Sequence, residues 1–251
     1  MSSRGSGGSG PNARAQRSLQ EAARRAAEQA ALRRRDRRRL VVLVVVLVLA
    51  LVGGGIGFQA WRTGRSPSAV PATSFSDPPQ PLTAGQPIRF GDPAAPVELT
   101  LYSDYHCPHC VDFEAEFGPT LTAAQAAGRL RLAVFPMSFV DAGSAPAANA
   151  VACAAQASFG ERYHRGLFAN ARLVWSERQL LALGALSTDA APVGFSDCVT
   201  GGQQVNWAEG INAAAAAAGV TQTPTLLLDG APLPVEGLTP ESLQTMIDAK
   251  G

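Results

Sequence analysis

Hydrophobic residues dominate one long uncharged run early in the chain, and beyond it they recur at strand or helix spacing. The run, residues 40–61, reads LVVLVVVLVLALVGGGIGFQAW and contains no charged side chain over 22 residues. A helix of this length reaches about 33 Å, and the hydrocarbon core of a bilayer is about 30 Å thick. The pattern therefore predicts one transmembrane helix over residues 40–61.

After residue 87 the pattern changes to a strand, a helix and a second strand. Apolar and polar residues alternate in VELTLYS (97–103), helical spacing runs from Pro108 to near Gly128, and LRLAVFPM (130–137) is again β-prone. Parallel strands need a long crossover, usually a helix, so this order predicts a parallel βαβ unit. The start of the helix then lies at the carboxyl edge of the sheet, where open α/β sheets bind ligands.

The rest of the pattern predicts a helical block and then a second half of the core. Residues 143–219 have helical spacing almost throughout. TPTLLLDG (223–230) and APLPVEG (231–237) then read as two strands, and the last helix follows Thr239, a residue type that caps helices. The expected fold class is α/β, with a βαβ…ββα core interrupted by a helical insertion. The core consists of residues 87–142 and 220–251.

Charge orients the predicted span. Residues 1–39 carry eleven Arg and three acidic residues, a net charge of +8, whereas residues 66–251 carry eight basic and seventeen acidic residues, a net charge of −9. An Arg-rich tail can bind nucleic acid, but basic residues beside a span stay cytoplasmic. We therefore expect no nucleic-acid partner. The expected location is the cell membrane, with a single pass, a cytoplasmic N-terminus and an extracytoplasmic catalytic domain.

A cleaved signal peptide is the main alternative to a membrane anchor. Its apolar core would normally be about 7–15 residues long and would precede an A-x-A-like site. Here the run is longer and no such site follows. Residues 62–86 contain five Pro, which favours an extended, semi-stiff linker. We expect this linker to hold the outer domain off the membrane.

Four cysteines lie beyond the predicted span, where disulfides persist: Cys107, Cys110, Cys153 and Cys198. Cys107 and Cys110 form a Cys-x-x-Cys pair. Haem attachment needs a His after the second cysteine, and residue 111 is Val. His106 and His109 would complete four possible zinc ligands, but these are too close in sequence for one tetrahedral ion if a helix begins at Pro108. No metal site is predicted, and copper transfer or a purely structural disulfide remain alternatives.

Thiol–disulfide exchange explains the spacing best. A thiol attacks a disulfide as the thiolate, and Cys107 at a helix N-terminus faces unpaired N–H groups that favour the charged form. Pro108 suits the first turn of that helix, and His109 can add a donor. Cys110, one turn inside, is expected to be less exposed and to resolve a mixed disulfide. Stabilising the Cys107 thiolate makes the oxidised pair a stronger oxidant.

These features resemble the DsbA-like proteins of the thioredoxin superfamily, over roughly residues 85–251. The resemblance is carried by FGDPAAPVELTLYSDYHCPHC, ANAVACAAQASFGERYHRGLFAN and GVTQTPTLLLDGAPLPVEG. It implies a thioredoxin fold with an inserted helical domain, and disulfide exchange on exported cysteine-containing proteins without a cofactor. It also implies that Cys107 is the nucleophile, Cys110 the resolving thiol and Pro224 a cis-proline facing them, with the backbone of Thr223 turned toward the substrate. Pro108–His109 match the dipeptide of strongly oxidising members.

The resemblance further implies a redox partner and a second disulfide. A membrane re-oxidant of the DsbB or VKOR type would restore the disulfide of the Cys107–Cys110 pair. Related proteins often pair cysteines at the places of Cys153 and Cys198, so a structural disulfide is expected there, with two buried reduced thiols as the alternative. The leading function is a disulfide oxidase. A reductase or isomerase, or a non-catalytic metal chaperone or binding module, are the alternatives.

Two positions depart from the family pattern. Members often have a buried acid six residues before the first cysteine, where this chain has Leu101, so a proton relay to Cys110 is not predicted. Gln222 precedes Thr223 where many relatives have Gly, which can alter the substrate groove. His164 lies mid-helix in ERYHRGLF and is expected to be a surface or packing residue.

Overall fold

The fold is taken from a computed structural model, which describes residues 43–44, 66–72, 77–138, 140–141, 143–171, 174–188 and 192–250. The chain divides into two units, residues 1–61 and 62–251. In the first unit only Leu43 and Val44 are described, and both are helical. The predicted tail (1–39) and the rest of the predicted span (40–61) lie outside the described residues. Within the part described, no helix combines the length and apolar character needed to cross a bilayer.

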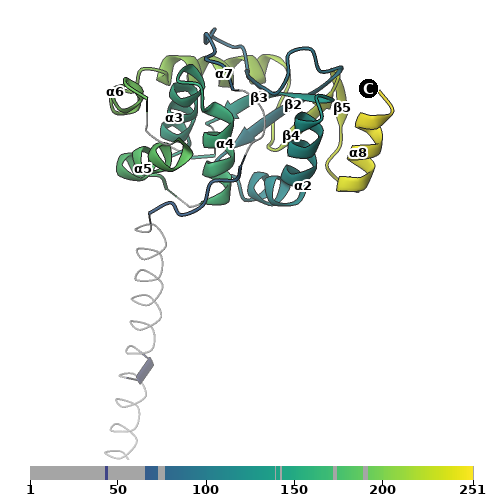
Figure 1. The fold of residues 1–251 in the computed structure, drawn as a ribbon. Helices are drawn as coiled ribbons and strands as arrows, with labels where there is room; N and C mark the ends of the chain where they lie inside the picture. Colours follow the sequence, from purple (N-terminus) through teal and green to yellow (C-terminus); the bar gives the residue numbers. More distant parts are fainter. Residues whose placement is uncertain are drawn as a thin grey trace, which may run out of the picture. The chain divides into compact units, whose positions relative to one another are not determined.

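A five-stranded mixed sheet forms the centre of the second unit (Figure 1). Its strands are β1 (Ile88–Phe90), β2 (Val97–Asp104), β3 (Leu130–Met137), β4 (Thr225–Leu228) and β5 (Ala231–Leu233), in the order β1-β3-β2-β4-β5. β2 and β3 run parallel and the other neighbours antiparallel. The apolar positions of the alternation that predicted β2 lie in the core, since Val97, Leu99 and Leu101 are fully buried. β2 thus runs through the core and ends three residues before Cys107.

Helix α2 (Pro108–Ala126) connects the two parallel strands. It begins at Pro108 because proline has a helical φ and lacks the N–H that the first turn leaves unpaired. It ends at Ala126, and Gly128, two residues later, adopts a φ of +68°. The Gly128 N–H donates to the Gln125 carbonyl at 2.9 Å and the Arg129 N–H to the Ala124 carbonyl at 3.0 Å, the C-terminal motif that glycine permits. The predicted βαβ unit is therefore confirmed.

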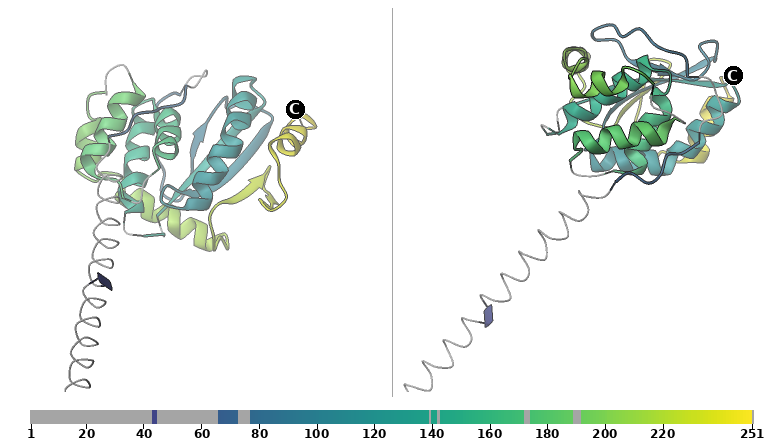
Figure 2. Two further views of the ribbon diagram at one scale, coloured as in Figure 1. Left: turned by 90° about the horizontal axis from the view of Figure 1, so that it is seen from below. Right: turned by 60° about the vertical axis from the view of Figure 1, so that its left-hand side comes forward.

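Five helices lie between β3 and β4 in the described part of the chain, where the sequence predicts a helical insertion. They are α3 (Ser144–Gln156), α4 (Gly160–Ala169), α5 (Glu177–Ser187), α6 (Phe195–Thr200) and α7 (Val205–Ala217). Helices α7 and α2 both pack on β3 and lie on opposite sides of the sheet in Figure 1. The last helix, α8 (Pro240–Asp248), packs against α2. Figures 1 and 2 show α3, α5 and α6 gathered away from α8, beyond the far end of the sheet.

The strand prediction was incomplete at two places. β1 was missed because three residues are too few to show an alternation, and only its antiparallel pairing with β3 reveals it. β5 was expected over residues 231–237 but ends at Leu233, just before Pro234, which has no N–H to donate. Pro232 is tolerated within β5 because this strand forms an edge of the sheet.

The described parts of the predicted linker (62–86) run along the domain and make contacts with it. The Trp207 indole N–H donates to the Thr83 carbonyl at 3.0 Å. The Glu161 N–H, at the start of α4, donates to the Asp77 carboxyl at 2.7 Å. Leu82 packs against the apolar core. Residues 77–86 are therefore structurally part of the domain that they precede.

Candidate active site

Cys107 stands at the very start of α2, as the residue before its first turn. Its backbone is extended, with φ −77° and ψ 118°, and its carbonyl accepts from the N–H groups of Cys110 and Val111, both at 3.1 Å. Its own N–H donates to the Asp104 carbonyl at 3.0 Å. The end of β2 and the first turn of α2 together hold the Cys-Pro-His-Cys segment. The Cys107 thiol therefore lies at the end of α2 where backbone N–H groups are unpaired and anions are favoured.

The two thiols of the pair lie in different surroundings. Both are free thiols in the structure, with Cys107 5% exposed and Cys110 fully buried. Burial raises the pKa of Cys110 to about 12, although the Ser103 hydroxyl and the Asp104 backbone partly stabilise its thiolate. Cys110 therefore keeps its proton at neutral pH. The exposure order matches the prediction, but Cys107 itself is more buried than the sequence suggested.

The Thr223–Pro224 segment meets the pair from the other half of the core. The peptide bond between Thr223 and Pro224 is cis. The Cys107 thiol donates to the Thr223 carbonyl over 3.4 Å between Sγ and O, although the two residues are 116 positions apart. The pairing of β2 with β4 starts after Pro224, at Thr225. The structure thus brings together Cys107 and the Thr223–Pro224 segment, which were predicted as site residues from two motifs far apart in the chain.

A groove of about 750 Å³ opens beside the pair. His109 on α2 lines it from one side, and Gln222, Thr223 and Pro224 line it from the other. Pro108 and His109 are both exposed at the start of α2. The groove is large enough for a short peptide segment, since ligand sites commonly measure about 300–1,000 Å³.

Leu101, where relatives often have a buried acid, is part of the apolar core. It is fully buried in β2 and pairs with Val134 on one side and Leu226 on the other. The buried carboxyl nearest in sequence belongs to Asp104, which accepts from the N–H groups of His106 at 2.9 Å and Val140 at 3.1 Å. Asp104 therefore shapes the loop that leads into Cys107.

His106, directly before Cys107, was considered as a possible zinc ligand. Its Nδ1 lies 2.9 Å from an Asp141 carboxyl oxygen, and its buried Nε2 has no hydrogen-bond partner among the described residues. Across that part of the chain, no three His, Cys, Asp or Glu side chains gather closely enough to hold a metal ion. The His106 ring lies so close to Gly143 that a Cβ there would be 2.5 Å from it, so only glycine fits at this position.

A buried polar network behind the pair was not predicted. The Tyr105 hydroxyl lies 2.8 Å from His164 Nδ1, and His164 Nε2 lies 3.2 Å from a Glu114 carboxyl oxygen. Burial raises the pKa of Glu114, but the hydrogen bond and charge of His164, with Arg165 nearby, outweigh this effect and leave the pKa below its usual value. His164 is thus an interior residue that ties α4 to α2 and to the loop before Cys107.

The network continues along α4 toward the segment before β1. Arg165 donates to one Glu161 carboxyl oxygen at 2.8 and 3.1 Å and to the Gln125 side chain at 2.8 Å. Burial raises the pKa of Glu161 to about 7 despite the Arg165 charge, and burial raises that of Asp77 to about 6. The four-residue spacing of Glu161 and Arg165 on one helix was the only sequence signal for this cluster.

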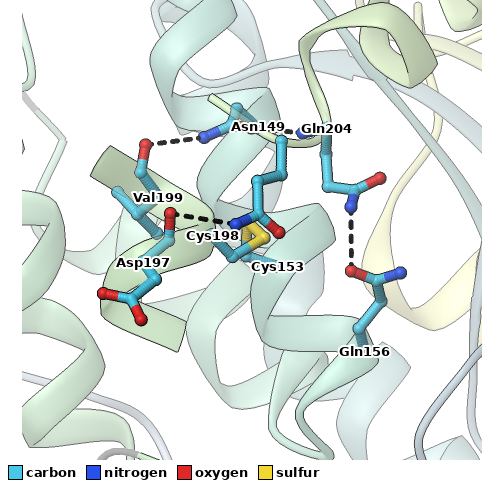
Figure 3. The surroundings of a disulfide bond; sticks show 8 residues. Asn149, Cys153, Gln156, Asp197, Cys198, Val199 and Gln204 are labelled. Atoms are coloured by element: carbon cyan, nitrogen blue, oxygen red, sulfur yellow. Dashed lines mark hydrogen bonds between the residues drawn. A yellow bond between two sulfur atoms is a disulfide. The ribbon is translucent and has the colours of Figure 1, made fainter. Parts of the chain in front are cut away.

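Cys153 and Cys198 form a disulfide that joins α3 to α6 (Figure 3). Both cysteines are buried. Beside the disulfide, the Asn149 side chain donates to the Val199 carbonyl at 3.2 Å and accepts from the Gln204 N–H at 2.8 Å. The disulfide and Asn149 therefore fasten the same two parts of the helical insertion.

Comparisons with known proteins agree with this geometry. A family model described as thioredoxin matches residues 83–249. No curated protein matches the chain. Reduced DsbA from Mycobacterium tuberculosis is 25% identical, with a TM-score of 0.54, and the match covers 66% of this chain and 92% of that one. Reduced DsbG from the same organism, a disulfide bond oxidoreductase, is 25% identical, with a TM-score of 0.54 and coverage of 67% and 89%.

More distant structures share the fold. BdbD from Bacillus subtilis is 18% identical, has a TM-score of 0.58, and is matched over 68% of this chain and 98% of its own. At this identity the likeness speaks for the architecture alone. The thioredoxin-like α/β fold with a mixed sheet, expected from the sequence, is therefore established for the second unit.

Proposed function

The chain belongs to the thioredoxin family, as a DsbA-like thiol–disulfide oxidoreductase, and from this premise we propose that it oxidises cysteine pairs in exported proteins. The observation that carries the proposal is the asymmetry of the two thiols. Cys107 lies at the N-terminus of α2 against Thr223 and beside the groove. Cys110 is fully buried and has a pKa raised to about 12. Substrate therefore reaches Cys107, and Cys110 is the buried leaving thiol behind it.

In the forward reaction, the oxidised form carries a disulfide between Cys107 and Cys110. A substrate thiolate attacks Cys107 Sγ, the bond between the two cysteines breaks, and its electron pair passes to Cys110 Sγ, which takes up a proton. A second substrate thiolate then attacks the substrate sulfur of the mixed disulfide and releases Cys107 as a thiolate. The substrate has lost two electrons and the enzyme has gained them. The high pKa of Cys110 keeps the new proton in place.

The reduced pair must then be re-oxidised by a second protein. We expect a membrane protein of the DsbB or VKOR type, as the sequence resemblance implies. Electrons from Cys107 and Cys110 would pass to a disulfide of that partner by the reverse exchange. The apolar run at residues 40–61 supports a membrane anchor that keeps both proteins in the same bilayer.

The proposed topology is tested by protease access. The Arg cluster before residue 40 predicts that protease added to intact, wall-free cells digests the chain beyond Trp61 and spares the tail. Fragments are detected with antibodies to each part, and permeabilised cells serve as the control in which both are digested. Protection of the cysteine-containing domain in intact cells would contradict the proposed orientation.

The reduction potential distinguishes an oxidase from a reductase. Equilibrated with glutathione buffers, the full-length protein in neutral detergent should show a Cys107–Cys110 potential near that of strong oxidants, about −120 mV. A value near about −270 mV, as in thioredoxin, would instead indicate a reductase. Replacing the exposed His109 with Ser removes one donor beside the pair and should lower the potential by about 30 mV, a tenfold change in the equilibrium. Glu177→Gln, at an exposed site on α5, is the control.

A further inference from the structure

The groove beside the pair has two walls that come from different halves of the core. One wall is the exposed side of α2, and the other is formed by the segment from Gln222 to Leu226 and by residues 232–236, which include the end of β5. Thr223 belongs to the second wall and touches the Cys107 thiol. A substrate segment whose cysteine reacts with Cys107 therefore passes between these two walls.

The inner surface of the groove is apolar. Phe113 and Phe117 back it from α2, with their rings stacked at a centroid distance of 4.8 Å. Pro224, Pro232 and Leu233 face them from the other wall. Apolar side chains of a bound segment gain free energy there by leaving water.

The rim of the groove is acidic on both walls. Asp112 and Glu116 lie on α2, and Glu236 lies across from them; all three are exposed. Among the described residues none of these carboxyl groups takes part in an ion pair, and neither Lys nor Arg lines the groove. Residues 66–251 as a whole carry a net charge of −9. The field at the mouth of the groove therefore attracts cations.

We propose that the groove selects substrate segments in which a Lys or Arg lies within a few residues of the reacting cysteine, next to an apolar side chain. This inference rests on the proposed function and names its substrate class. The attacking group is a thiolate, so the acidic rim repels it. A neighbouring cationic side chain offsets that repulsion and pairs with Glu116, Asp112 or Glu236. Several like charges around one cleft act mainly by raising the rate at which oppositely charged segments meet the protein, whereas a single exposed ion pair adds little to the stability of the complex.

The test uses three short peptides with one cysteine and one leucine, identical except that Lys, Gln or Glu flanks the cysteine. Mixed-disulfide formation with the oxidised full-length protein is followed by stopped flow. Each rate is divided by the rate of the same peptide with bis(2-hydroxyethyl) disulfide, because a flanking charge also changes the thiolate fraction of the peptide. At low salt the corrected Lys rate should exceed the Glu rate about tenfold. In 1 M salt, where the Debye length is about 3 Å, the ratio should approach one.

Two variants assign the effect to the rim. Glu116→Gln combined with Glu236→Gln should reduce the Lys-to-Glu ratio about threefold, whereas Glu177→Gln on α5 should leave it unchanged. The rate of reduction by uncharged dithiothreitol is measured in every variant as a control, because it depends on the reactivity of Cys107 and not on the charge of the rim. A corrected ratio near one at low salt, or a ratio that Glu116→Gln with Glu236→Gln does not change, would overturn the inference. Failure of all peptides and of dithiothreitol to react would instead overturn the proposed function.

Discussion

Replacing Cys110 with Ser is expected to trap covalent complexes between Cys107 and exported proteins, whereas replacing Cys107 with Ser should abolish exchange. Cys107 is the thiol at the N-terminus of α2, in contact with Thr223, which lines the groove, and Cys110 is the buried thiol behind it. In the Cys110→Ser variant, the Cys107 thiolate attacks a disulfide of an oxidised exported protein, and one cysteine of that protein leaves as a thiolate. The resulting mixed disulfide has no internal nucleophile to resolve it. Without Cys107 the remaining thiol is inaccessible and has a pKa raised to about 12, so almost no thiolate is present at neutral pH.

The complexes are measured on non-reducing gels after acid quenching, and their partners are identified by mass spectrometry after reduction. Cys110→Ser should give a ladder of complexes that disappears with dithiothreitol, and Cys107→Ser should give the pattern of the double variant. Exchange with a model substrate should fall to the uncatalysed rate in Cys107→Ser. If Cys107→Ser traps as many partners as Cys110→Ser, the assignment of nucleophile and resolving thiol is wrong.

Local patterns in the sequence were sufficient to predict the helix and strands of the half of the core that carries Cys107 and Cys110. Alternation predicted β2, Pro108 predicted the start of α2, and the β-prone run 130–137 predicted β3 with the bounds observed. Each of these signals depends on residues close together in the chain. The place of Cys107 at the carboxyl end of β2 also follows from them, because the helix that follows a strand begins where that strand ends.

Long-range polar contacts were not predictable in the same way. Tyr105 and His164 are 59 residues apart, and His164 and Glu114 are 50 apart, so no periodicity links them. His164 lies in a helix of mixed polar and apolar residues, where a surface position looks equally reasonable. Only the packing of α4 against α2 decides that its ring is buried, and burial then requires hydrogen-bond partners. The network is thus a property of the tertiary structure.

Breaking the Cys153–Cys198 disulfide should lower the free energy of unfolding by about 4 kcal/mol. The two cysteines are 45 residues apart in the sequence, so the disulfide closes a long loop and restricts the conformations of the unfolded chain. For a domain of this size the melting temperature should fall by roughly 10 °C. The comparison is cleanest in a Cys107→Ser, Cys110→Ser background, where a reductant can break only this one disulfide. The same polypeptide is then unfolded with urea in both states, and no side chain is removed from the buried site.

Loss of the disulfide should leave the site itself intact. The bridge joins α3 to α6, and Asn149 still holds the same region through Val199 and Gln204 (Figure 3). The Thr223 contact and α2 belong to other parts of the domain. A Cys153→Ala, Cys198→Ala variant with the active pair present should therefore react with dithiothreitol at the wild-type rate below its melting temperature. Equal stability of the oxidised and reduced forms would show that the bridge is not structural, and a lost reaction rate would show that it supports Cys107 directly.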